Sequence, residues 1–269
     1  MIANKLFYGE TLNGVYREIL SSLVGEQDNR IHNKTKEGLS ELVNCSFEVS
    51  NPRNCFATVR DMSMKYLEGE MEFYLSGSPL LQDIAKLSKF WERCSDDGVT
   101  INSNYGKLLI HDTNTHGNTQ FQYARDMLLQ NPESKKAVMM IYSPNHSYKS
   151  SDNPCTLSLQ FLIRDGEVNL YVKMRSSDVW YGLPYDVPFF VLLQFMMRDA
   201  LAKQGHFYEV GVYNHNAGSL HLYDRNREQA EKVVWGTHIL EYWTPQKELF
   251  EKYIEGNVRK WNEARTNNN

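Results

Sequence analysis

The chain has 269 residues, of which 41% are hydrophobic and 23% charged, and its formal net charge is −4. This composition is ordinary for a globular protein, and the length allows one large domain, so we treat residues 1–269 as a single domain. The chain shows no basic stripe and no run of about 18 apolar residues, so we expect neither a nucleic acid nor a membrane as partner.

The N-terminal half of the chain predicts helices around one strand. In chain order, the elements are a helix at 6–24, a polar loop at 28–38, a strand at 39–49, a helix at 64–75 that ends at Gly77, and a helix at 80–93. Apolar residues at helical spacing indicate the first helix. Gly77 and Pro79 are typical of a helix end and of the start of the next helix.

The C-terminal half predicts a hairpin packed against a buried helix. The elements are a short strand at 137–142, alternating segments at 156–163 and 167–174 around a turn at 164–167, a helix at 187–203, a strand at 207–213 and a final helix at 245–264. Strict alternation on both sides of an Asp-Gly turn is a strong hairpin signal. This mixture of hairpins and helices indicates an α+β fold around one sheet.

The chain has four cysteines, and their spacing bears on its redox environment. Cys45, Cys55, Cys94 and Cys155 form no CxxC pair and no metal-ligand spacing with a histidine. We therefore expect free thiols in a reducing compartment, and no metal. The first residues lack the long apolar run of a signal peptide, so we expect a cytoplasmic protein.

Cys155 is the candidate nucleophile. It follows Asp152, Asn153 and Pro154 at the mouth of the hairpin, where reactive side chains are often exposed. A thiolate is the attacking form, and a free thiol with a pKa of about 8.5 needs a nearby cation. Arg175 lies nearly symmetrically across the turn and could supply that charge. The alternative is that Cys155 is a small buried apolar residue.

Several basic residues are candidates for binding a phosphate. Arg175 opens the polar segment 175–178 (RSSD) at the end of an apolar strand, and its planar guanidinium can bind two phosphate oxygens. Lys135 and Lys136 precede a buried strand and could also hold a phosphate. Adjacent lysines more often form a solvated edge, which is the alternative for this pair.

Other polar positions have both a functional and a structural interpretation. Asp186 lies just before a buried helix and could cap it. His221 and Tyr223 are two apart on a strand and face the same way, so they could bind a sugar hydroxyl or line a core face. Glu70 lies on the apolar face of its helix, where a carboxylate is costly unless it is paired or functional.

Taken together, these segments resemble thymidylate synthases and, more closely, the deoxycytidylate hydroxymethylases of phages. The matching segments, in chain order, are 70–74 (EMEFY), 101–106 (INSNYG), 131–136 (NPESKK), 154–155 (PC), 174–178 (MRSSD), 182–186 (GLPYD) and 218–223 (GSLHLY). Each segment is short. The ordered set, built around R-S-x-D-x-x-x-G-L-P with a cysteine about 20 residues upstream, is specific.

The resemblance implies a fold, an assembly and a reaction. The fold would be a mixed sheet with flanking helices, and the protein would be a homodimer that shares its active sites. The substrates would be a pyrimidine nucleoside monophosphate and 5,10-methylenetetrahydrofolate. Cys155 would add to C6 of the base and make C5 nucleophilic toward the methylene carbon, while Glu70 would organise proton transfers. Asp178 and Asp186 complete the predicted catalytic set.

The resemblance also assigns binding roles. The phosphate would be bound by Arg175 and Ser176 and by three lysines where the family usually has arginines, Lys34, Lys135 and Lys136. The ribose would be bound by His221 and Tyr223. The folate would meet Asp178, Trp91, Tyr105 and Gly182, with Trp91 stacking on the pterin. A lysine keeps the positive charge but loses the two-pronged geometry of arginine.

Two departures from thymidylate synthases bear on the product. Asp186 stands where they carry an asparagine that reads uracil, and a carboxylate can accept from the exocyclic amine of cytosine. The tail ARTNNN does not resemble their hydrophobic C-terminal closure, so water could reach the intermediate. We therefore predict a hydroxymethylase acting on dCMP. The alternatives are a CMP hydroxymethylase, a methylating enzyme acting on dUMP or dCMP, and a non-catalytic nucleotide- or RNA-binding homologue.

Overall fold

A mixed β-sheet organises the molecule. The computed structural model describes residues 4–25, 30–31, 37–143, 149–236 and 246–266. Within these residues the sheet has seven strands in the order β1-β3-β7-β6-β5-β4, with β2 beside β3. The strands are β1 Leu6–Gly9, β2 Arg30–Ile31, β3 Leu39–Val49, β4 Val138–Met140, β5 Thr156–Arg164, β6 Glu167–Asp178 and β7 Glu209–Tyr223. The pairs β1–β3 and β6–β7 are parallel, and the other pairs are antiparallel.

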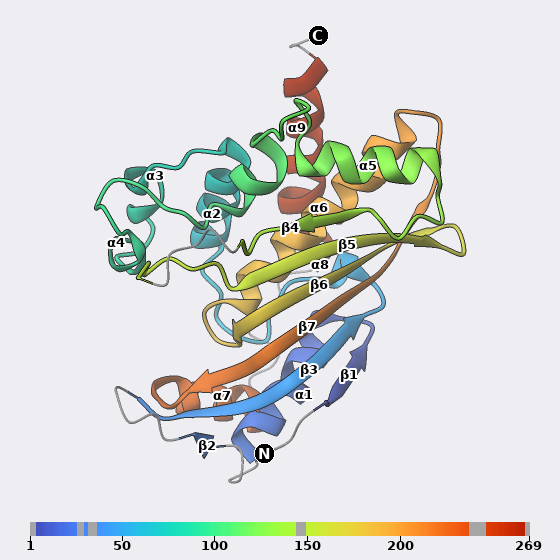
Figure 1. Ribbon diagram of the computed structural model, residues 1–269. Coiled ribbons are helices and arrows are strands. Elements are labelled where there is room, and N and C mark those ends of the chain that lie inside the picture. The colour runs from blue at the N-terminus through green and yellow to red at the C-terminus, as the bar shows by residue number, and fades with distance from the viewer. Residues whose placement is uncertain (1–3, 26–29, 32–36, 144–148, 237–245, 267–269) are drawn as a thin grey trace.

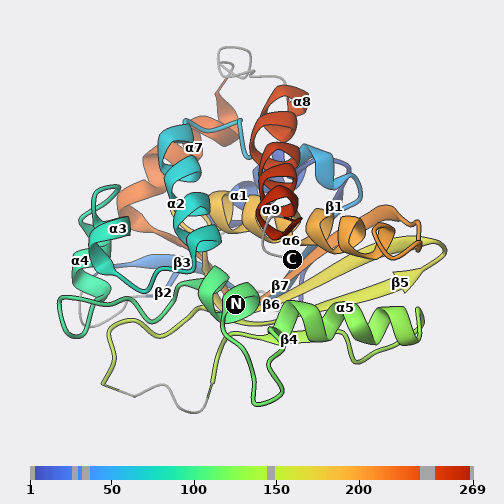
Figure 2. The same cartoon turned by 90° about the horizontal axis from the view of Figure 1, so that it is seen from above.

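Helices gather on one side of this sheet, with α6 packed against β6 and β7 (Figures 1 and 2). The helices are α1 Leu12–Gly25, α2 Met64–Ser76, α3 Leu81–Ala85, α4 Phe90–Cys94, α5 Gln120–Gln130, α6 Leu183–Ala202, α7 Arg227–Trp235, α8 Gln246–Leu249 and α9 Gly256–Thr266. Short 3₁₀ or π segments lie at Pro52–Asn54, Lys107–His111, Asp224–Asn226 and Phe250–Glu255. Within the described ranges, no helix combines the length and apolar character needed to span a bilayer. The predicted α+β fold is confirmed.

The predicted hairpin is present as β5 and β6. Arg164 pairs with Glu167, and the two residues between them, Asp165 and Gly166, have φ values of 54° and 81°. A two-residue turn of this kind needs positive φ at both positions, which aspartate tolerates and glycine adopts freely. The hairpin therefore follows from the Asp-Gly pair, and it places Cys155 directly before β5.

Helix α6 begins earlier than its apolar spacing predicted. It starts at Leu183, with Pro184 in its first turn, where the missing backbone donor costs nothing. Gly182 is the residue that precedes the helix, and no side chain caps its first turn. Asp186 thus lies inside the first turn and does not cap the helix, so a functional interpretation of this carboxyl gains weight.

Other expected elements differ from the structure. Residues 6–24 divide into β1 and α1, because Leu6 to Gly9 pair in parallel with β3 and alternate between exposed and buried positions. The helix expected at 80–93 is two short helices, α3 and α4. The polar loop expected at 28–38 includes the short strand β2, and the strand expected at 207–213 runs from 209 to 223 as β7. At residues 6–9, strand pairing with β3 outweighs the local helical spacing.

Candidate active site

Several of the predicted residues meet at one end of the sheet. Cys155 precedes β5, Asp178 ends β6, and the turn after Asp178 leads into α6. The two central strands bring Asp178 beside His221 on β7. The backbone N–H of Gly182 donates to the Asp178 carbonyl at 3.0 Å, so the start of α6 is tied to the end of β6. Three segments that are distant in sequence thus converge on the mouth of the hairpin.

Arg175 holds the loop that carries Cys155. Its backbone N–H donates to the Cys155 carbonyl at 2.8 Å, while its Nε and Nη2 donate to the carbonyls of Pro154 at 3.0 Å and Asn153 at 2.8 Å. Burial raises the pKa of the half-buried Cys155 thiol, and the Arg175 guanidinium opposes that rise. Arg175 therefore both holds the loop at residues 153–155 in place and is the cation that favours the thiolate form of Cys155.

Glu70 is buried at the centre of a hydrogen-bond cluster on α2. The hydroxyls of Tyr66 and Tyr74 donate to its Oε1 at 3.1 and 3.4 Å. Burial raises the pKa of Glu70 to about 8, the charge of Asp186 adds to the rise, and the two tyrosine hydroxyls oppose it. Glu70 therefore holds a proton near neutral pH, as a proton-transferring residue requires.

Asp186 and Asp178 form a second acidic group at the start of α6. Burial raises the pKa of Asp186 to about 7, with a contribution from the charge of Asp178. The Asp178 Oδ1 accepts from the backbone N–H groups of Trp180 at 2.8 Å and Tyr181 at 3.2 Å, which fixes the turn. A Cβ at Gly182 would lie 3.1 Å from the Asp178 carbonyl oxygen and 3.3 Å from Asp186 Oδ2, so the turn fits glycine.

Tyr105 is buried close to the other residues of this site. Its buried ring stacks on Tyr74 at 5.4 Å between centroids and on Phe190 at 6.1 Å. Burial raises its pKa, and the charges of Asp186 and Cys155 add to the rise, which shows that all three side chains share one environment. The resemblance placed Tyr105 in the active site, and its position in the structure is compatible with that role.

Asp152 is a site residue to which the sequence interpretation gave no role. It is 5% exposed, and its Oδ2 accepts from the backbone N–H of Asn102 at 2.6 Å and of Ser103 at 2.9 Å. This carboxylate ties the turn that leads to Tyr105 to the loop that carries Cys155. The only signal in the sequence is its place three residues before the cysteine.

The predicted sugar-binding pair lies on β7. His221 is 6% exposed, its ring meets the Tyr223 ring edge-on at 5.1 Å, and its Nδ1 lies 3.3 Å from the Ser219 hydroxyl. Burial lowers the pKa of His221, so the imidazole is neutral near pH 7. Ser176 is half-buried on β6, opposite Ser219 in the neighbouring strand.

The predicted phosphate lysines lie apart from this cluster. Lys135 and Lys136 are exposed in the segment between α5 and β4, the strand at the end of the sheet. Lys34 lies outside the described residues. Trp91, predicted to stack on folate, is 5% exposed, and its indole Nε1 donates to the Tyr66 hydroxyl at 3.1 Å. Among the described residues, no group of three His, Cys, Asp or Glu side chains could hold a metal ion.

Sequence comparison identifies the family. The thymidylate synthase family model matches residues 14–242. The chain belongs to the thymidylate synthase family. Among the relatives of this family member, the deoxycytidylate 5-hydroxymethyltransferase of Enterobacteria phage T4 is 31% identical over 201 residues, 72% of this chain and 79% of the relative. The deoxyuridylate hydroxymethyltransferase of Bacillus phage SP01 is 26% identical over 271 residues, 94% of this chain and 69% of the relative.

Structural comparison supports the same fold. The thermostable thymidylate synthase A of Bacillus subtilis superposes with a TM-score of 0.67 at 20% identity, covering 84% of each chain. The chain is therefore a thymidylate-synthase-type protein whose relatives include one-carbon transferases named for hydroxymethylation.

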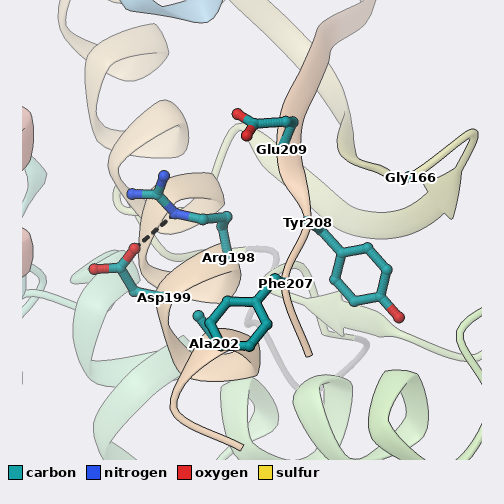
Figure 3. A pocket seen from close by; sticks show the side chains of 7 residues that line it. All are labelled: Gly166, Arg198, Asp199, Ala202, Phe207, Tyr208 and Glu209. Atoms are coloured by element: carbon teal, nitrogen blue, oxygen red, sulfur yellow. Dashed lines mark ion pairs between the residues drawn. The ribbon is translucent and has the colours of Figure 1, made fainter. Parts of the chain in front are cut away.

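A separate hollow in this thymidylate synthase family member lies at the other end of α6. The hollow is lined by Arg198, Asp199 and Ala202 of α6, by Phe207 and Tyr208 just before β7 and by Glu209 at its start; in Figure 3 the Tyr208 ring points away from Arg198 and Asp199. Arg198 and Asp199 form an ion pair at 2.6 Å. No predicted site residue lines this hollow, so it is distinct from the site at the mouth of the hairpin.

Proposed function

We propose that this protein is a hydroxymethyltransferase that converts a cytidine monophosphate nucleotide, with dCMP favoured, to its 5-hydroxymethyl form. The cosubstrate would be 5,10-methylenetetrahydrofolate. One observation carries the proposal. The half-buried side chain of Asp186 lies in the first turn of α6, and its charge raises the pKa of both Cys155 and Glu70. A pyrimidine base bound next to Cys155 would therefore lie near the Asp186 carboxyl, which could hydrogen-bond to it.

Asp186 favours cytosine over uracil on hydrogen-bonding grounds. An ionised carboxylate accepts hydrogen bonds and donates none. Cytosine presents an exocyclic amine at C4, whereas uracil presents a carbonyl oxygen there. A mismatched contact of this kind costs about 1–3 kcal/mol, which is about 5- to 150-fold in selectivity. The name of the phage T4 relative agrees with this choice of base.

The residues of the site support each step of cysteine-based chemistry. Cys155 would add to C6 of the base and raise the electron density at C5. Arg175 would hold the nucleophile loop and favour the thiolate, and it would bind the phosphate together with Ser176. Glu70 would exchange its proton with the pyrimidine ring as charge develops there. The folate would supply the one-carbon unit that C5 attacks.

The proposed folate residues fit this role to different degrees. Gly182 packs against the Asp178 carbonyl and Asp186 Oδ2, where a Cβ would be too close, so it would serve the folate site by allowing this tight turn. Asp178 already uses Oδ1 to hold the turn, so its Oδ2 would face the folate. Tyr105 would support the base side through Tyr74. Trp91 is buried and bonded to Tyr66, so stacking on a pterin would require the ring to become more exposed.

A homodimer with shared sites is part of the proposal. The side chains that alternate with the core residues of β5, β6 and β7, among them Leu162, Tyr171 and Val212, are only half-buried. A second copy packed on this sheet face would cover them. Lys135 and Lys136 are exposed at the end of the sheet, from which they would reach the phosphate in the partner's site.

Tritium release tests the proposal. The wild-type protein would be incubated with 5-tritiated dCMP, CMP or dUMP and methylenetetrahydrofolate, and the products identified by mass spectrometry. We expect release mainly from dCMP, a hydroxymethyl product and no dihydrofolate. Release mainly from dUMP would favour the second candidate, a deoxyuridylate enzyme, which the phage SP01 relative supports. A methyl product together with dihydrofolate would refute the hydroxymethyl assignment.

A further inference from the structure

A chain of hydrogen bonds leads from α4 to Glu70. Trp91 on α4 donates its indole N–H to the Tyr66 hydroxyl at 3.1 Å, and that hydroxyl donates to Glu70 Oε1 at 3.1 Å. Tyr66, Glu70 and Tyr74 are four residues apart on α2 and form one stripe on the helix. Tyr74 donates to the same oxygen at 3.4 Å.

The donor and acceptor capacities of the indole, the tyrosine hydroxyl and the carboxyl fix the direction of these hydrogen bonds. An indole nitrogen can only donate, and a tyrosine hydroxyl has one proton to give. Because the Tyr66 oxygen accepts from Trp91, its own proton is directed to Glu70. Oε1 then accepts from two hydroxyls, so the proton that Glu70 carries near neutral pH belongs on Oε2.

We propose that Tyr66 and Trp91 are positioning residues for Glu70, which hold one carboxyl oxygen as an acceptor and leave the other to exchange a proton with the base. The inference rests on the proposed function for the identity of the base. The hydrogen bonds themselves involve only the side chains of Trp91, Tyr66, Glu70 and Tyr74.

Aromatic packing keeps the chain in place. The Tyr66 ring meets the Tyr185 ring edge-on at 4.8 Å, and Trp91 packs against Phe73 at 6.3 Å. Phenylalanine at position 66 or 91 would keep an aromatic ring while removing the polar atom. The variants Tyr66→Phe and Trp91→Phe therefore separate hydrogen bonding from packing.

The neighbours of Glu70 define what each variant should do. Its own helix presents Tyr66 and Tyr74, while α6 presents Asp186 and Tyr185. The tyrosine hydroxyls favour the ionised carboxylate, and the Asp186 charge opposes it. Tyr66→Phe should therefore raise the pKa of Glu70 further. Loss of a hydrogen bond to a charged group corresponds to about one pKa unit.

Carboxyl ¹³C NMR of the ligand-free protein measures this directly. The Glu70 resonance would be assigned by its loss in Glu70→Gln and titrated in the wild type, Tyr66→Phe, Trp91→Phe and the double variant. We expect a rise of about one unit in Tyr66→Phe and a smaller rise in Trp91→Phe. In the double variant, loss of Trp91 should add nothing, because it acts through Tyr66.

Tyr123→Phe is the matched control, since this tyrosine is 41% exposed on α5. An unchanged Glu70 pKa in Tyr66→Phe would overturn the proposal. It would also be overturned if Trp91→Phe changed the Glu70 pKa by the same amount in the wild type and in the Tyr66→Phe background. A Trp91→Phe variant that raised only the KM for folate would overturn it as well. Wild-type turnover is scored separately, so a failure of the proposed function leaves the NMR result decisive for this inference.

Discussion

Replacing Glu70 by glutamine should stabilise the protein at alkaline pH. The amide has the shape of the carboxyl and can still accept from Tyr66 and Tyr74, but it carries no charge. Folding raises the pKa of Glu70 from 4.5 to about 8. A carboxyl of this kind contributes stability below its unfolded pKa, and that contribution is lost as the pH rises through its folded pKa. Above about pH 8 the wild type must bury a charge that the variant lacks.

The size of the effect follows from the shift. A change of about 3.5 units at about 1.36 kcal/mol per unit corresponds to about 5 kcal/mol over the full pH range. Between about pH 5.5 and about pH 9, the linkage relation predicts that the free energy of unfolding of the wild type falls by about 3 kcal/mol relative to that of the variant. Measuring the change between two pH values cancels any constant offset between glutamine and a protonated glutamate.

Urea unfolding at these two pH values is the assay. The free energy of unfolding of Glu70→Gln minus that of the wild type should increase by about 3 kcal/mol from the lower to the higher pH. Protein concentration must be held constant, since a dimer gains stability by mass action. The same comparison in Glu72→Gln, an exposed position on the same helix, should give no such increase.

A difference that stayed constant between the two pH values would refute the reasoning. It would mean that Glu70 ionises as easily in the folded protein as in the unfolded chain. The burial and the Asp186 charge would then have no energetic consequence, and the assignment of Glu70 as a proton donor near neutral pH would fall with them.

Other substitutions address the rest of the site. Cys155→Ser should lower tritium release by about 10⁴-fold or more while nucleotide binding, measured by calorimetry, persists. Replacing Lys135 and Lys136 together by alanine should raise the KM for nucleotide. If subunits share sites, mixing this variant with the inactive Cys155→Ser protein should give heterodimers that turn over nucleotide at concentrations too low for the lysine variant alone. Asp152→Ala should lower kcat by about 10- to 100-fold, because the nucleophile loop loses its tie. Asp186→Asn should shift selectivity toward dUMP in competition assays by about 5- to 150-fold.

Local sequence signals predicted the fold where they agreed with tertiary contacts. The Asp-Gly turn sets the β5–β6 hairpin by itself, and the continuous apolar face of α6 requires burial. The signals failed at β1, where four residues pair with β3 although their apolar spacing continues into a helix. Local spacing does not report a parallel partner about 40 residues away. Strand β7 was predicted too short because residues 214–219 (NHNAGS) include no large apolar residue, so this stretch lacks the apolar alternation that indicates a strand.

The candidate site shows the same contrast between what the sequence signals and what tertiary contacts decide. The residues placed by the resemblance, such as Cys155, Glu70 and Asp178, lie where the strands and α6 converge. Asp152 was missed because it acts through a contact with another segment. Tyr66 had a signal, its four-residue spacing from Glu70. The bond from Trp91 to Tyr66 joins α4 to α2, and spacing within one helix cannot reveal it.

In the proposed reaction, the neighbouring carboxyls of Asp186 and Glu70 would connect the choice of base to proton transfer. Hydrogen bonds from a cytosine amine would favour the ionised form of Asp186. The charge of Asp186 raises the pKa of Glu70, so binding the correct base would keep the proton on Glu70 until the chemical step. An asparagine at position 186 would remove this coupling along with the preference for cytosine. The cost is a less stable protein at high pH, which is a common consequence of burying catalytic groups.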